Sequence, residues 1–136
     1  MLEDWILKKK EIENSKDQLK GADLCNAKLM QAKLKGACLE DADLTAAYLI
    51  KADLSEANLS GADLTQAVLS EANLAGADLD GAELTDTFLN GANLKDVQNL
   101  TCDQIELANF DAETKFPDYI TIKWSSDGCC ECLEEI

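Results

Sequence analysis

Leucine occupies every fifth position from Leu24 to Leu94, and alanine stands two residues before each leucine, with Thr87 as the one exception. The residue between them is usually Asp or Asn. Five residues advance an α-helix by about 140°, and side chains in a flat strand alternate with a period of two, so neither element buries the leucines together. The pattern predicts short extended Ala-x-Leu steps with both ends inward, joined by two-residue corners.

The corner residues and a longer periodicity support this interpretation. Leu19 extends the register backwards, and six of the seven glycines fall two places after a leucine of this register, where a tight bend tolerates positive φ. If four corners close one coil, residues 20 apart stack, which places Thr45, Thr65 and Thr85 in one column. We expect an all-β solenoid whose coils pair through their backbones at a spacing of about 4.8 Å. Its predicted structural core consists of Leu24, Leu29, Leu34, Leu39, Leu44, Leu49, Leu54, Leu59, Leu64, Leu69, Leu74, Leu79, Leu84, Leu89 and Leu94.

The tandem Ala-(Asp/Asn)-Leu-x-x motif over residues 21–96 resembles the pentapeptide-repeat proteins, which are most abundant in cyanobacteria. The resemblance implies a right-handed quadrilateral parallel β-helix, here of about four coils. The segment from Leu100 to Asp118 is similar to the C-terminal caps of many members. Most members have no assigned activity, and the best understood subset binds DNA gyrase as a DNA mimic and protects it from quinolones.

A solenoid exposes unpaired backbone at both ends, so we expect caps. Residues 1–20 are predicted to form an N-terminal helical cap, because Leu2, Trp5, Ile6 and Ile12 share one stripe of a helical wheel. The solenoid then covers residues 21–98. A C-terminal cap covers residues 99–117, where Thr101 to Gln104 read as a capping box. Residues 118–136 are predicted to be a strand, at Tyr119–Trp124, followed by a loose cysteine-containing tail.

One wall of the predicted solenoid carries an apolar stripe. Its outward residues include Tyr48, Ile50, Val68 and Phe88, whereas the other three walls carry almost no outward apolar side chains. Clustered exposed apolar side chains mark a surface that something covers. The cover is either this chain's own termini, at the Tyr119–Trp124 segment or the N-terminal helix, or a protein partner or second copy; plain exposure is the third interpretation.

A second candidate is an acidic ladder formed by Asp23, Asp43, Asp63 and Glu83, which stack if coils have 20 residues. One interpretation is a DNA mimic aimed at the basic groove of an enzyme such as DNA gyrase. A ladder of under four coils is only on the order of 15–20 Å long, which spans few base pairs. We therefore favour a solvated face whose carboxylates accept hydrogen bonds from corner amides.

The cysteines form a third candidate. Cys129, Cys130 and Cys132 contain a C-x-x-C spacing, which is typical of redox pairs and of half a metal site. A zinc site would need Cys102 or a second chain in addition. Incidental reactive thiols, a regulatory or intermolecular disulfide, and a metal role all remain open, and we predict no resident metal or cofactor.

Composition narrows the function further. The chain has 136 residues, 27 Asp plus Glu against 12 Lys, no Arg, no His and a net charge of −15. The missing His and Arg exclude His-based nucleophile systems and bidentate phosphate clamps, and the charge disfavours direct nucleic-acid contact. With an interior filled by Leu and Ala, no cleft for chemistry is expected, so an enzyme is disfavoured. We predict a non-catalytic structural or protein-interaction module without membrane contact, cytoplasmic because no secretory signal or apolar spanning run is visible.

Overall fold

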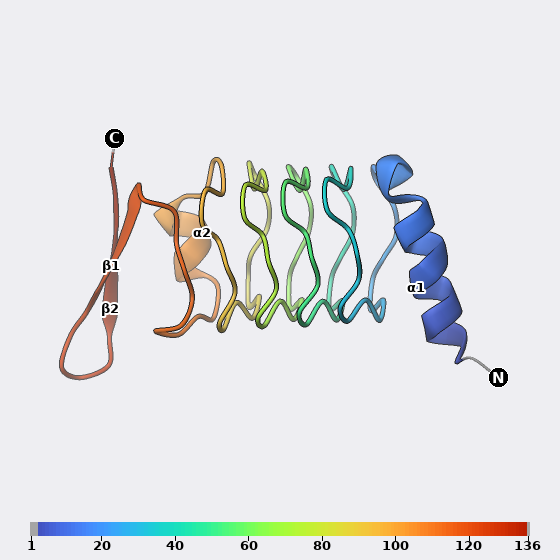
Figure 1. The fold of residues 1–136 in the computed structure, drawn as a ribbon. Coiled ribbons are helices and arrows are strands. Elements are labelled where there is room, and N and C mark those ends of the chain that lie inside the picture. The colour runs from blue at the N-terminus through green and yellow to red at the C-terminus, as the bar shows by residue number, and fades with distance from the viewer. Residues whose placement is uncertain (1–2, 136) are drawn as a thin grey trace.

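The computed structural model describes residues 3–135 and shows an elongated stack of coils, with a helix across one end and a β-hairpin at the other (Figure 1). Its elements in chain order are α1 (Asp4–Asn14), the 3-10 helix η1 (Lys16–Gln18), α2 (Cys102–Glu106), β1 (Ile120–Trp124) and β2 (Cys130–Glu134). Leu2, which the sequence places on the first helix, lies outside the described residues. Within residues 3–135, no helix is long and apolar enough to span a membrane.

Successive coils pair in parallel at positions 20 residues apart, so each coil holds four five-residue repeats. Asp23 pairs with Asp43, and Asp43 pairs in turn with Asp63. The N–H of Leu24 donates to the carbonyl of Asp43 at 2.8 Å, and the N–H of Asp43 donates to the carbonyl of Ala22 at 2.9 Å. The middle residue of each Ala-x-Leu step thus bonds to the preceding coil, while the alanine carbonyl and the leucine N–H on either side of it bond to the next coil. The backbone of the stack is therefore satisfied from coil to coil.

Each corner is a tight turn from a repeat leucine to the next alanine. The N–H of Ala47, for example, donates to the carbonyl of Leu44 at 3.0 Å, and Ala46 between them has a φ of 58°. Positive φ at the third residue alone identifies a type II turn. Glycine is not the rule there: Ala46, Lys51, Glu56 and other non-glycine residues adopt the same left-handed conformation. The stacked backbone bonds hold those residues in a conformation that is unfavourable for an L side chain.

The interior is a column of leucine and alanine. All fifteen repeat leucines are buried, and those from Leu29 to Leu94 are at most 1% exposed. The alanine column is interrupted by Thr87, which is fully buried and donates its hydroxyl to the carbonyl oxygen of Leu64 at 2.6 Å. The hydroxyl is therefore accommodated by a hydrogen bond to the backbone of the preceding coil.

The N-terminal segment replaces a missing coil partner. Ile12 is the buried residue of α1 and packs on the core. The carboxylate of Glu13 accepts the N–H of Lys33 at 2.7 Å, and the carbonyl of Lys16 accepts the N–H of Cys38 at 2.8 Å. These acceptors occupy the place of a coil that would precede residue 21.

The C-terminal segment departs from the 20-residue spacing. Phe88 pairs with Asn109, and Asn93 pairs with Lys115, so the last coil is longer than the others. Within this longer coil, α2 begins with the predicted capping box, in which Thr101 and Gln104 exchange side-chain to backbone bonds. The amide of Gln104 also donates to the carbonyl oxygens of Leu79 and Ala82 at 2.8 and 2.9 Å.

The expectation of a loose tail after residue 124 is wrong for residues 130–134. This segment forms β2, which pairs antiparallel with β1 in a register that places Ile122 opposite Cys132. Tyr119 anchors the start of the hairpin, since its hydroxyl donates to the carbonyl of Val97 and accepts the N–H of Leu100, both at 2.9 Å. The sequence does not predict β2, because alternating Cys and Glu lack the apolar and β-branched residues that are typical of strands.

Candidate functional site

The apolar stripe lies on one wall of the stack. Lys28, Tyr48, Val68, Phe88 and Asn109 follow one another in consecutive coils, each paired in parallel with the next. At a spacing of about 4.8 Å per coil, this column is about 19 Å long. Its backbone is fixed by the coil-to-coil bonds, so the side chains project from a rigid surface. The structure thus brings the predicted residues of the stripe together.

The side chains in the centre of the stripe are open to solvent. Tyr48 is 44% exposed and Phe88 is 41% exposed, while Val68 and Ile50 are half-buried. Large aromatic side chains in this state lose favourable burial unless a further surface covers them. Among the described residues, the chain's own termini leave both rings accessible.

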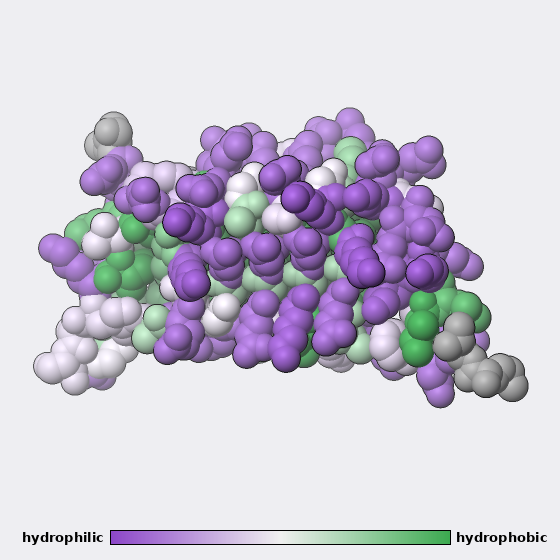
Figure 2. All heavy atoms as spheres, in the orientation of Figure 1, coloured by the Kyte–Doolittle hydropathy of each residue, from purple (hydrophilic) through white to green (hydrophobic). Residues whose placement is uncertain are grey.

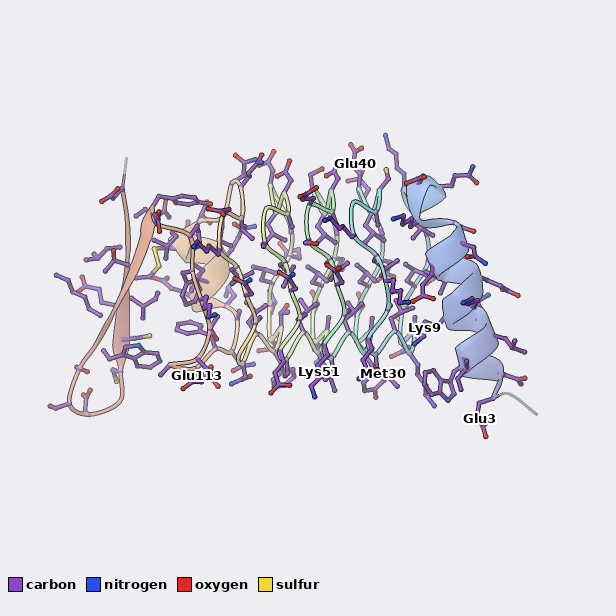
Figure 3. The ribbon with its side chains drawn as sticks, viewed as in Figure 1. Glu3, Lys9, Met30, Glu40, Lys51 and Glu113 are labelled. Atoms are coloured by element: carbon purple, nitrogen blue, oxygen red, sulfur yellow. A yellow bond between two sulfur atoms is a disulfide. The ribbon has the colours of Figure 1, made fainter. Side chains whose placement is uncertain are left out.

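The helix α1 reaches only the first end of the stripe. Trp5 joins Lys28, Met30, Tyr48 and Ile50 around a shallow hollow of about 300 Å³. Lys9 holds the helix there, because its Nζ donates to the carbonyl of Met30 at 3.2 Å and lies 5.9 Å from the centre of the Trp5 ring. Figure 3 shows Lys9 and Met30 close together at this end. The hollow adds apolar surface to the stripe without closing it.

The hairpin lies at the other end and does not cover the stripe. Phe110 packs edge-on against Phe116 and against Trp124, with ring centroids 5.3 and 5.9 Å apart. A second hollow of about 440 Å³ opens there, and its lining includes Asn90, Asn109 and Trp124. Figure 2 shows hydrophobic side chains gathered at both ends of the stack on the face in view. Cover by Tyr119–Trp124, one of the interpretations left open by the sequence, is therefore absent over Tyr48 and Phe88, because that segment packs on the last coil.

The edges of this wall carry residues that the sequence analysis did not single out. Lys51 lies on one edge, in the corner that follows Leu49, and Figure 3 places it on the same side of the stack as Met30. Asp86 lies on the other edge, and its N–H donates to the carbonyl of Leu107 at 2.8 Å. Leu107 is 54% exposed. The sequence offers one signal for Leu107: an apolar residue at an outward corner, two residues before Asn109, which ends the column.

The acidic ladder is stacked as expected, with Asp23, Asp43, Asp63 and Glu83 paired in consecutive coils. The Asp43 carboxylate accepts the N–H of Thr45 at 3.0 Å, and the Asp63 carboxylate accepts both the N–H and the hydroxyl of Thr65. Hydrogen bonds from Thr45 lower the pKa of Asp43 below its ordinary value. These carboxylates thus bind corner groups of their own coil, which accounts for their position without a ligand.

The cysteines of the C-terminal segment differ from the C-x-x-C expectation. Cys132 forms a disulfide with Cys102, which joins β2 to α2, while Cys129 and Cys130 are free and exposed. The capping box and the hairpin place the two Cα atoms 5.6 Å apart, within the range that a disulfide spans. Cys132 therefore has no thiol to share with Cys129, and the predicted C-x-x-C pair does not form.

Other chemistry finds little support in the described part of the chain. Over residues 3–135, no group of three or more His, Cys, Asp or Glu side chains is placed to hold a metal ion. Cys25 lies beside the acidic ladder, where desolvation and the nearby Asp43 carboxylate raise the pKa of its thiol. A raised pKa makes this thiol a weak nucleophile at neutral pH.

Comparison with known proteins identifies the repeat. The family model for pentapeptide repeats matches eight copies, over residues 18–45, 27–66 and 57–96. A comparison with curated proteins found no match.

Solved structures of pentapeptide-repeat proteins are also similar to this chain. One from the cyanobacterium Cyanothece is 32% identical, with a TM-score of 0.46, over 74% of this chain and 67% of that one. One from Nostoc is 31% identical, with a TM-score of 0.46, over 83% and 85%. One from the thylakoid lumen of Arabidopsis thaliana is 34% identical, with a TM-score of 0.43, over 71% and 75%.

The repeat motif, the parallel stacking at 20-residue intervals and the family match agree with one another. Pentapeptide-repeat proteins are generally non-catalytic structural repeat proteins. The chain belongs to the pentapeptide-repeat family and has its right-handed β-helix fold.

Proposed function

We propose that this protein is a non-catalytic interaction module that binds protein through the apolar stripe. The observation that carries the proposal is the exposure of Tyr48 and Phe88, at 44% and 41%, on a wall that both termini leave open. Exposed aromatic side chains on a rigid surface are typical anchors of protein interfaces, because they bury much apolar area with little loss of conformational freedom.

The flanking hollows extend this surface. Trp5 contributes apolar area at one end and Trp124 at the other. The central column contains no carboxylate, since its members are Lys28, Tyr48, Val68, Phe88 and Asn109. A partner can therefore desolvate the wall without burying an unpaired negative charge.

The acidic ladder supports a DNA mimic less well. The carboxylates of Asp43 and Asp63 already accept corner hydrogen bonds, and the ladder repeats at the coil spacing over three intervals only. Binding or protection of an enzyme such as DNA gyrase thus remains the alternative, which a supercoiling assay with added protein would test. Loss of supercoiling inhibition in Asp43→Asn but not in Phe88→Asp would favour the alternative.

We also propose that α1 and α2 act as caps on a β-helix of about four coils. The support is that groups next to or within both helices bind the backbone of the terminal coils. Glu13 accepts from Lys33 at one end, and Gln104 donates to Leu79 at the other. Such contacts would keep two molecules from joining end to end.

An affinity capture experiment tests the binding role. Immobilised wild-type protein, Phe88→Asp and the control Gln98→Glu are compared in an extract of the source cells and with free copies of the chain itself. Gln98 is exposed in the column of the opposite wall, where it pairs with Asp78, so the control adds a negative charge away from the stripe. We expect wild type and control to retain the same protein and Phe88→Asp to lose it. Equal retention by all three would contradict the proposal.

A further inference from the structure

The charges on the four walls indicate which partner binds the apolar stripe, an inference that rests on the proposed function. Among the four walls, the stripe is the one whose central column lacks a carboxylate; the others contain Asp43, Asp53 or Asp78 in paired columns. Two copies of a chain with a net charge of −15 repel each other over most approaches. They can meet at low electrostatic cost through this wall.

We propose that the stripe binds a second copy of this chain, related by a two-fold axis through Val68. Closed two-fold dimers use the same patch on both subunits, so the patch must be complementary to itself. Val68 is the third of the five paired positions of the column, with Tyr48 before it and Phe88 after it. An axis perpendicular to the wall at Val68 places Tyr48 of each copy against Phe88 of the other.

The same axis exchanges the two edges of the wall, and the edge residues are complementary. Lys51 lies on one edge in the coil before Val68, as part of the same coil as Tyr48. Asp86 lies on the opposite edge in the coil after it, beside Phe88. The axis therefore brings the exposed ammonium of Lys51 to the exposed carboxylate of Asp86 in the second copy.

The outer edge positions match as well. Met30 lies on the Lys51 edge two coils before Val68, in the coil of Lys28. Leu107 lies on the Asp86 edge two coils after Val68, because its carbonyl accepts the N–H of Asp86 from the next coil. The two-fold axis places Met30 against Leu107 of the second copy. This contact would bury the Leu107 side chain, which is 54% exposed in the single chain.

Lys51 has an internal partner that the dimer does not require. Its Nζ lies 3.6 Å from the Glu71 carboxylate, and both side chains are more than half exposed. An exposed pair of this kind contributes little to stability. Lys51 is thus free to turn toward Asp86 of the second copy with little loss.

Cysteine cross-linking tests this arrangement directly. Cys25, Cys38, Cys129 and Cys130 are replaced by serine, and Val68→Cys, Tyr48→Cys and Phe88→Cys are introduced separately. A residue on the axis faces its own copy, whereas Phe88 lies one coil from the axis, so two copies of it are about 10 Å apart and outside disulfide reach. On oxidation we expect covalent dimers from Val68→Cys alone, and from a mixture of Tyr48→Cys with Phe88→Cys. Cross-linking of Phe88→Cys alone, without cross-linking of Val68→Cys, would overturn the two-fold arrangement.

Charge reversal provides a second readout in variants that keep the exposed aromatic residues. Sedimentation of Lys51→Glu and Asp86→Lys separately should show dimers weakened by about tenfold or more, because each variant turns both symmetry-related interface pairs into like-charge pairs. In an equimolar mixture of the two variants, the mixed dimer restores both pairs, and the double variant restores both in its own dimer, so we expect the mixture and the double variant to dimerise like wild type. Additive weakening in the double variant would overturn the proposal. If no variant dimerises but Phe88→Asp still loses a captured partner, the two-fold inference fails while the proposed function stands.

Discussion

The carboxylate of Asp111 accepts the backbone N–H of Gly91, with 3.0 Å between Oδ1 and N. In regular coils the corner N–H donates to a main-chain carbonyl of the next coil, as from Glu71 to Asn90 at 2.9 Å. The last coil is longer, and the side chain of Asp111 supplies the acceptor that the displaced backbone cannot. The same carboxylate accepts the N–H of Glu113 at 3.1 Å.

This arrangement predicts a dependence of stability on pH. The hydrogen bond from Gly91, followed by those from Thr114 and Glu113, lowers the pKa of Asp111 below the ordinary 3.8. The ionised carboxylate thus stabilises the folded state above about pH 4, and this stabilisation is lost as the pH falls through the lowered pKa of the folded chain. We expect thermal unfolding of Asp111→Asn to change less between about pH 5 and about pH 2.5 than that of wild type.

Asp118→Asn is the control for this experiment, since Asp118 is exposed in the same segment. An equally flat response in both variants would show that Asp111 has no special part in the acid sensitivity.

The buried hydroxyl of Thr87 is expected to stabilise the stack. Thr87→Val keeps the side-chain shape but removes the donor to the carbonyl of Leu64, which is 2.6 Å away. We expect a loss of about 1 kcal/mol in the free energy of unfolding, measured by denaturant titration. Thr121→Val, an exposed site on β1, should leave stability unchanged. Wild-type stability in Thr87→Val would contradict this role.

Two alanines in corners should respond to glycine with opposite signs. Ala46 has a φ of 58°, whereas Ala75 occupies the first position of its corner, outside the left-handed region. Ala46→Gly relieves the strain of an L side chain and should stabilise the protein by about 0.5–1 kcal/mol. Ala75→Gly only increases the conformational freedom of the unfolded chain, so it should destabilise the folded protein by a similar amount. A shift of the same sign in both would show that the corner conformation is not under strain.

The disulfide should stabilise the hairpin and not the coils. Cys102→Ser releases β2 from α2, and closing a 30-residue loop of this kind contributes about 2–4 kcal/mol. We expect hydrogen exchange over residues 119–135 to rise by more than about tenfold while residues 21–98 stay protected. Cys130→Ser, at a free exposed thiol, is the control. Unchanged hydrogen exchange in the hairpin would contradict a stabilising role of the disulfide. Cys102 and Cys132 found fully reduced in cells would favour the predicted cytoplasmic location.

The repeat could be predicted from the sequence because every five-residue unit has the same pattern of inward and outward residues. Leu64 is buried because Ala62 and Leu64 end an extended step, and the same holds one coil earlier and later. The paired columns follow from the period alone, which is why the sequence predicts that Tyr48, Val68 and Phe88 share one wall. No long-range information was needed, since each coil contacts only its neighbours.

The ends could not be predicted in the same way, because they depend on particular long-range contacts. The Cys102–Cys132 disulfide requires α2 and β2 to meet, and the chain offers no pattern for that meeting. Asp111 acts as a backbone substitute only because the last coil is longer. Whether the termini cover the stripe depends on where Trp5 and Trp124 pack, and the sequence does not determine this.

Light scattering over a range of concentrations gives the molar mass of the chain in solution and tests whether the apolar stripe joins two copies. Wild type, Phe88→Asp and Gln98→Glu are compared, with circular dichroism to show that all three are folded. We expect the mass of wild type and of Gln98→Glu to rise toward twice the mass of one chain as concentration increases, while Phe88→Asp stays at the mass of one chain. A single-chain mass for wild type at every concentration, or the same dimer in Phe88→Asp, would contradict this expectation.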